Sequence, residues 1–206
     1  MAALPPPPRR LWESGSRDEW RAALVTETKA AAHLAKNVKA KQKLPSRNAR
    51  FYSWTPKAGD GVTRADLVKL MEWKLTRGKM RPLMRFIVAL DEQEVVESTK
   101  EGLAMVPADD EAGLDLNALS RSVERISELK GVGPATASAL LSRYNPRLFP
   151  FMSDEVLVVA GNRERKHTLK RYLQLAEEVA AKARETGMAA DEVERAIWAS
   201  TVLNGT

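Results

Sequence analysis

The sequence predicts an all-α fold, and three observations lead to that prediction. Apolar residues recur at spacings of three and four along most of the chain, residues that favour helix N-caps precede several of these stretches, and no stretch alternates as a half-buried strand does. With 206 residues and 44% hydrophobic content, the chain is long enough to bury a core. We expect a proline-rich disordered tail over residues 1–15 and one compact multi-helix domain over residues 16–204.

The first predicted helix begins at Ser16, where Glu19 three residues later matches the capping-box pattern. Apolar residues at helical spacing extend it to about Lys43. Pro45 and Pro56 bracket the next stretch, which we predict to be a connection because proline often marks loops.

The middle of the chain predicts three more helices. Thr63 is expected to cap a helix with a core-facing apolar stripe, and Gly78 is placed to end it. Pro82 suits the first turn of the next helix, which runs to about residue 90. The third covers residues 92–106, and the acidic residues 107–115 after it are predicted to form a loop.

The C-terminal half has the most regular pattern. Its predicted helices cover residues 116–129, 134–144, a stretch from 156 onward, 168–185 and 190–202. Gly131 and Gly133 separate the first two of these helices, and a Ser-Asp-Glu triplet at residues 153–155 precedes the third.

Composition excludes several kinds of site. The chain has no cysteine, which rules out disulfides, thiolate zinc sites, iron–sulfur clusters and a cysteine nucleophile. Neither His33 nor His167 has a partner at metal-ligand spacing, so we expect both at exposed helix positions, with no metal centre and no cofactor. No apolar run approaches the length of a membrane span, and the proline-rich start lacks the apolar stretch of a signal peptide. We therefore predict an intracellular protein, nuclear or cytoplasmic, with no membrane partner.

Charge is unevenly distributed along the chain. The formal net charge is +6, residues 29–57 hold eight Lys or Arg and no acid, and residues 91–115 hold nine acids and one lysine. Such a chain is able to present a basic face to nucleic acid while its acidic segment is turned away. The pattern favours a polyanionic partner.

Residues 129–141, LKGVGPATASALL, have the pattern of two helices joined by a tight glycine turn. Glycine permits positive φ and leaves no side chain over the turn, so the backbone N–H groups that open the second helix are able to approach a phosphate oxygen. The valine is expected to plug inward between the helices, with the lysine beside the site as a further cation. The candidate binding residues are Lys130, Gly131, Val132, Gly133, Ala135 and Thr136.

A second basic cluster surrounds WKLTRGKMRP, residues 73–82. Cations on its exposed side are candidates for phosphate contacts, each of which steepens the salt dependence of binding. Trp73 is a candidate for stacking on an unpaired base, but its spacing from Leu70 favours the core. The candidate nucleic-acid contacts in this cluster are Lys74, Arg77, Lys79 and Arg81.

LKGVGPATASALL resembles the helix-hairpin-helix of DNA repair proteins, especially that of the helix-hairpin-helix DNA glycosylase superfamily. The resemblance implies that duplex DNA is bound through its phosphate backbone. It also implies a catalytic aspartate at the head of a later helix, here Asp154 in FPFMSDEVL, which stabilises charge on the sugar and positions a water once the base is flipped out. Glycosylases that also cleave the backbone place a lysine where this chain has Ala135, so the resemblance points to a monofunctional glycosylase and excludes a Schiff base through that position.

A wider resemblance rests on four motifs in order, MEWKLTRGKMRP, LKGVGPATASALLS, PFMSDE and VERAIW. Over residues 63–200 they are similar to an uncharacterised group of eukaryotic proteins without an established activity. This resemblance supports the fold and leaves the function open.

Asp154 also has a structural interpretation. Ser153 or Asp154 would cap the helix that follows in any protein, stabilising it by about 1 kcal/mol. The alternatives to an enzyme are a non-catalytic module that binds DNA or a protein partner through the glycine turn, and a scaffold that binds no nucleic acid. A base-sized pocket into which Asp154 opens would favour the enzyme.

Overall fold

The computed structural model describes residues 7–108, 113–161 and 166–205. Within these ranges the chain is all-α, as predicted, and its only β feature is an isolated bridge between Lys57 and Gly61. No helix in these ranges is long and apolar enough to cross a bilayer. The helices are α1 (Pro8–Glu13), α2 (Arg17–Leu24), α3 (Glu27–Asn37), the 3-10 helix η1 (Lys39–Lys41), α4 (Leu44–Ser53), α5 (Arg64–Arg77), α6 (Met84–Ile87), α7 (Glu92–Ala104), α8 (Leu116–Ser127), α9 (Pro134–Tyr144), α10 (Asp154–Val159), α11 (Leu169–Thr186) and α12 (Ala190–Asn204).

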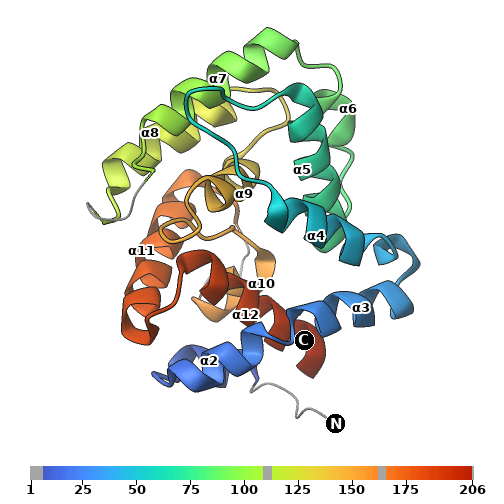
Figure 1. Cartoon of the computed structure of the whole chain (residues 1–206), viewed down its shortest axis with the longest axis vertical. Coiled ribbons are helices and arrows are strands. Elements are labelled where there is room, and N and C mark those ends of the chain that lie inside the picture. The colour runs from blue at the N-terminus through green and yellow to red at the C-terminus, as the bar shows by residue number, and fades with distance from the viewer. Residues whose placement is uncertain (1–6, 109–112, 162–165, 206) are drawn as a thin grey trace.

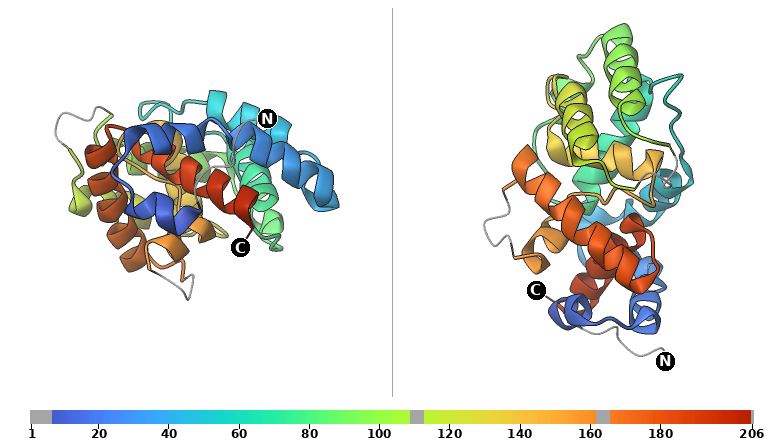
Figure 2. Two further views of the ribbon diagram at one scale, coloured as in Figure 1. Left: turned by 90° about the horizontal axis from the view of Figure 1, so that it is seen from below. Right: turned by 90° about the vertical axis from the view of Figure 1, so that its left-hand side faces the viewer.

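Helix α12 is at the centre of the lower half of the molecule in Figure 1, where it packs against α1, α2, α3, α10 and α11. Val193, Ile197 and Trp198 are fully buried on it, and a helix covered on nearly all sides is a core helix. The paired helices α7 and α8 lie at the opposite end, and the right-hand view in Figure 2 shows the same separation. Helices α5 and α9 lie between these two ends and pack against each other.

The N-terminal tail differs from the prediction of disorder. Residues 8–13 form α1, and Leu11 on this helix is fully buried against the rest of the core. Pro8 stands in the first turn, where its fixed φ suits a helix and its missing N–H leaves no bond unmade. The prediction of disorder was therefore wrong for residues 8–13. Residues 1–6 of the predicted tail lie outside the described ranges.

The helix predicted from Ser16 to Lys43 is divided into α2, α3 and η1. Ser16 caps α2 as expected, because its side chain accepts a hydrogen bond from the Glu19 amide. The break falls at Thr26, whose hydroxyl donates to the Ala23 carbonyl at 2.6 Å. Such side-chain bonds compete with the regular helix ladder, which gives a physical reason for the interruption.

The stretch predicted as a connection after Pro45 contains helix α4. Pro45 lies in its first turn, so the proline starts a helix here and does not break one. Phe51 on α4 stacks on Trp73 of α5 with ring centroids 3.5 Å apart, and the Trp73 indole donates to Asn48. Trp73 is therefore a core residue, as its spacing favoured.

Helix α5 has the predicted limits. Thr63 accepts a hydrogen bond from the Asp66 amide at its N-terminus, and Gly78 follows its last residue. The following helix, α6, covers only residues 84–87 and is shorter than predicted. The helices predicted at 92–106, 116–129, 134–144, 168–185 and 190–202 are confirmed as α7, α8, α9, α11 and α12.

Lys41 of η1 closes the C-terminal end of α5. Its amine donates to the carbonyls of Thr76, Arg77 and Gly78 at 2.7–2.8 Å. A cation is favourable there because the last carbonyls of a helix lack partners and carry the negative end of its dipole. This contact fixes the start of the loop over residues 78–83.

Candidate active site

An open pocket of about 180 Å³ lies where the end of α5, the turn before α9, the start of α10 and residue 167 meet. Apolar side chains, among them Leu75 and Phe151, form part of its wall. Nine of the eleven residues predicted for the site line it, which are Lys74, Arg77, Lys79, Arg81, Gly131, Gly133, Ala135, Thr136 and Asp154. The structure thus brings together two clusters that are about fifty positions apart in the sequence.

The turn between α8 and α9 is built around Val132. Its side chain is 6% exposed and its amide donates to the Leu129 carbonyl at 2.9 Å, so the valine plugs inward as expected. Its side chain is therefore not available to a ligand. Lys130 is exposed and does not line the pocket, and its amine lies 5.4 Å from the centroid of the Phe86 ring, a cation–π contact.

The two glycines of the turn have different physical roles. Gly131 has φ +89°, and a Cβ atom there would lie 2.7 Å from Cβ of Phe86, so the fold requires glycine. Gly133 has φ −128° and ψ −178°, which any residue adopts, and a Cβ atom there would meet nothing within 4 Å. The fold therefore makes no demand for glycine at 133, and the open space in front of it belongs to the pocket.

The first turn of α9 offers backbone and not side chains. Ala135 and Thr136 are 8% and 2% exposed, and Gly133, the N-cap, has no side chain with which to cap the helix. Within the described residues, the amide nitrogens of Gly133 and Ala135 have no hydrogen-bond acceptor. Free amides and the positive end of the helix dipole favour an anion at this position.

Asp154 lies in the pocket wall, and its neighbour Ser153 is the residue that caps α10. The Ser153 hydroxyl accepts from the Val156 amide at 3.4 Å. The Asp154 carboxylate lies 3.1 Å from Nε2 of His167 and 3.7 Å from Nζ of Lys79, with its side chain 20% exposed. The N-cap of α10 is therefore Ser153 and not Asp154.

His167 is not the exposed residue that the sequence predicted. Its side chain is 26% exposed and its ring nitrogen is within hydrogen-bonding distance of Asp154. The sequence carries no signal for this contact, because the two residues are thirteen positions apart and come from different elements. His33 is exposed, as predicted. The described residues contain no group of three His, Cys, Asp or Glu placed to hold a metal ion.

Among the described residues, three accessible cations line the pocket. Lys79 and Arg81 are exposed in the loop after α5, whereas Lys74 is half-buried on the last turns of α5. Burial lowers the pKa of the Lys74 amine to about 8; the charge of Arg81 acts in the same direction and that of Asp154 opposes it.

Arg77 does not serve as a phosphate ligand, which corrects the prediction. Its side chain is 1% exposed, and Nη2 lies 2.9 Å from both carboxylate oxygens of Glu194 on α12. The guanidinium also lies over the rings of Trp73, Phe151 and Trp198, at 4.7–5.5 Å from their centroids. The position of Arg77 on α5 directs its side chain toward α12 and away from solvent.

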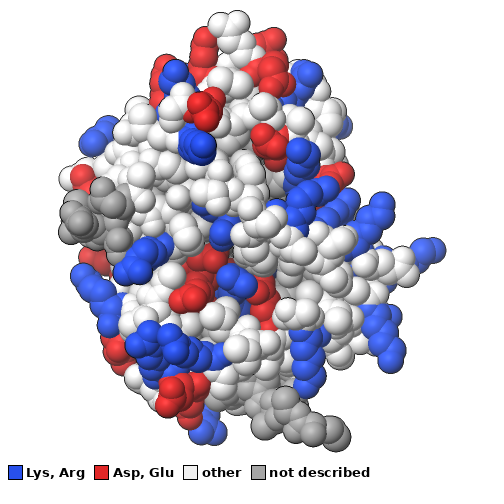
Figure 3. Space-filling view, viewed as in Figure 1, with Lys and Arg blue, Asp and Glu red and all other residues white. Residues whose placement is uncertain are grey.

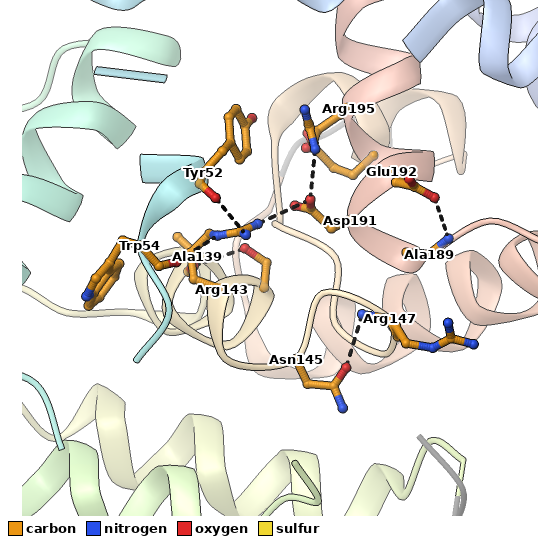
Figure 4. Close-up of polar contacts among 12 residues, drawn as sticks. Tyr52, Trp54, Ala139, Arg143, Asn145, Arg147, Ala189, Asp191, Glu192 and Arg195 are labelled. Carbon is orange, nitrogen blue, oxygen red and sulfur yellow. Dashed lines mark hydrogen bonds and ion pairs between the residues drawn. The ribbon is translucent and has the colours of Figure 1, made fainter. Parts of the chain in front are cut away.

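A second charged group, away from the pocket, joins α3, α4, α9 and α12 (Figure 4). Arg143 donates to the Tyr52 carbonyl and to the carboxylate of Asp191, which also pairs with Arg195. Arg195 in turn pairs with Glu27. Buried charges of this kind need partners, and the sequence did not predict this network because its members are far apart in the chain.

The surface charge is polarised as the sequence suggested. In Figure 3, acidic side chains gather at the end of the molecule formed by α7, and Lys and Arg side chains follow the edge formed by α3 and α4. The acidic residues at the α7 end are therefore at a distance from that basic edge.

A model of a protein family of unknown function, DUF6308, matches residues 30–198. The chain belongs to this family. No curated protein and no solved structure matches the sequence. The part that matches DUF6308 contains every residue that lines the pocket.

Proposed function

We propose that this DUF6308 protein binds duplex DNA through the turn between α8 and α9 and hydrolyses the N-glycosidic bond of a damaged or mismatched base. One observation carries the proposal. Asp154 and the free amides that open α9 line the same pocket, while Ser153 performs the capping that would otherwise explain the aspartate. The pattern LKGVGPATASALL, which resembles the helix-hairpin-helix of DNA glycosylases, supports it.

Binding begins at the phosphate backbone. A Cβ atom at Gly133 would meet nothing within 4 Å, and this open space beside the free amides allows the close approach that a phosphate oxygen needs. Lys79 and Arg81, exposed in the loop after α5, supply positive charge at the same pocket. These contacts set the position of the strand and carry no base preference of their own.

Catalysis then depends on the Asp154 carboxylate. Cleavage of the glycosidic bond develops positive charge on the sugar, and a fixed carboxylate in a partly buried pocket stabilises that charge. His167 and Lys79 contact the carboxylate oxygens and hold them in place. A water positioned by Asp154 completes the hydrolysis in a single step, with no covalent intermediate through Ala135.

The test is base release from a panel of duplexes that carry damaged or mismatched bases, with wild type compared to Asp154→Asn. We expect release by wild type and a loss of about 10²–10³-fold in the variant, the usual effect of removing one electrostatic group from an active site. Asp18→Asn is the matched control, because Asp18 also lies in the first turn of a helix but is exposed and remote from the pocket.

DNA affinity is measured in parallel at several salt concentrations. DNA binding without base release from any duplex would contradict the proposed hydrolysis and indicate a non-catalytic DNA-binding module. Negligible affinity even at low salt would refute DNA binding altogether.

A further inference from the structure

Lys74 is an amine in the pocket that the proposed hydrolysis does not use. It lies on the last turns of α5, is half-buried, and shares the pocket wall with Asp154 and Ala135. Lys79, by contrast, is exposed and pairs with Asp154. Among the described residues, no acceptor lies within hydrogen-bonding or ion-pair distance of the Lys74 amine.

The surroundings of Lys74 favour the neutral form of its amine. Burial is the main cause that lowers its pKa to about 8, Arg81 adds to it, and Asp154 opposes it. Lys79, His167 and Glu155 line the same pocket, and the guanidinium of Arg77 lies buried one turn along α5. At pH 7 an amine with a pKa of about 8 is uncharged in roughly one molecule in ten, against roughly one in three thousand at 10.5.

We propose that Lys74 is a nucleophile that forms a Schiff base with the aldehyde of an abasic deoxyribose, so that the pocket also cleaves DNA at abasic sites. The proposal rests on the proposed function, since that function delivers the abasic sugar to the pocket. The absence of an amine at Ala135 excludes Schiff-base chemistry only through that position. Lys74 supplies an amine to the same pocket from a different helix.

The chemistry balances without an oxidant or a reductant. The neutral amine of Lys74 attacks C1′ of the open-chain sugar. The carbonyl oxygen takes one proton from the amine and one from solvent and leaves as water, so that a protonated imine remains. A proton then leaves C2′ for the Asp154 carboxylate, which lines the same pocket, and the bond from C3′ to oxygen breaks so that the phosphate departs with the electron pair. Water finally hydrolyses the conjugated imine and restores the amine.

Borohydride trapping tests this inference. The full chain is incubated with a labelled duplex that contains one abasic site, sodium borohydride reduces any imine to a stable amine, and the covalent adduct is quantified and its attachment site mapped by mass spectrometry. We expect an adduct at Lys74. Lys74→Arg keeps the positive charge but removes the nucleophile, because a guanidinium is not deprotonated in proteins, and should lower trapping by about a hundredfold.

Two controls separate chemistry from structure. Lys100→Arg changes an exposed lysine on α7 and should leave trapping unchanged. Thermal melting and affinity for a duplex with a reduced abasic analogue show whether Lys74→Arg is folded and still binds. Trapping by wild type should also rise with pH to a midpoint near 8, because the neutral amine accumulates as the pH passes its pKa.

The outcomes distinguish this inference from the proposed function. Base release without trapping, or an adduct that maps to another lysine and persists in folded Lys74→Arg, overturns the role of Lys74 alone. Trapping through Lys74 without base release supports the inference and overturns the glycosylase. A chain that does not bind the abasic duplex overturns both.

Discussion

A buried ion pair joins α5 to α12, in which Nη2 of Arg77 donates to both carboxylate oxygens of Glu194 at 2.9 Å. Ser153 donates to the same carboxylate, so the pair also fixes the residue that caps α10 and precedes Asp154. Burial raises the pKa of Glu194, and the charge of Arg77 opposes that effect. The ion pair is therefore a structural support directly behind the candidate active site.

Glu194→Gln should lower the free energy of unfolding by about 3–5 kcal/mol, because it leaves the Arg77 cation buried without its counter-charge. Denaturant unfolding measures the change. Glu177→Gln is the control, since Glu177 is exposed on α11 and its loss should stay within about 0.5 kcal/mol. A change of similar size in both variants would contradict a special role for the pair.

The two glycines of the α8–α9 turn should respond in opposite ways. Gly131→Ala should cost about 1–2 kcal/mol from its positive φ alone, with a further cost from the contact with Phe86. Gly133→Thr should leave stability within about 0.5 kcal/mol, because threonine ranks with glycine at an N-cap and open space faces the position.

The affinity for duplex DNA should fall in Gly133→Thr although the melting temperature of this variant does not. The added side chain occupies the space through which a phosphate approaches. Titrations of both variants at one low salt concentration measure this. Unchanged affinity in Gly133→Thr would show that the backbone does not approach DNA at this turn.

Lys79→Ala and Arg81→Ala should each reduce the slope of log K against log salt by about 1, since each exposed cation is expected to neutralise one phosphate. The loss should be similar for different duplex sequences. Arg184→Ala removes an exposed cation from α11, away from the pocket, and should not change the slope. Equal slopes in all three variants would place the DNA on another face.

His167→Gln should lower the rate of base release by about tenfold with little change in DNA affinity, because it loosens the orientation of the Asp154 carboxylate. Single-turnover kinetics separate the rate from binding. His33→Gln provides the matched control at an exposed helix position remote from the pocket. If affinity fell and the rate did not, His167 would act on binding instead.

Local signals in the sequence predicted helices where tertiary contacts agree with them. The Thr63 cap, the Gly78 stop and the apolar seam of α8 all correspond to observed features. Proline was misread at α1 and α4, since it stands in the first turn of both helices and does not mark a loop. The break at Thr26 depends on a hydroxyl–carbonyl bond that no spacing pattern reveals.

The candidate site was predictable to the extent that it depends on backbone turns. The glycine turn and Asp154 both line the pocket. The burial of Arg77 was not predictable, because its partner Glu194 is 117 positions away. His167 joined the site in the same way, through a contact that exists only after the chain has folded.

The walls of the pocket come from separate stretches of chain, at the end of α5 and its loop, before α9, at the start of α10 and at His167. No one of them forms the pocket alone, so a ligand that occupies it binds the folded chain and not the unfolded chain. Such a ligand adds about 2.7 kcal/mol of apparent stability at a concentration of 100 times Kd. For a chain of this size that corresponds to a rise of about 5–10 °C in Tm. A melting curve thus becomes an affinity assay, in which short duplexes with different lesions are ranked by the Tm that the protein reaches in their presence.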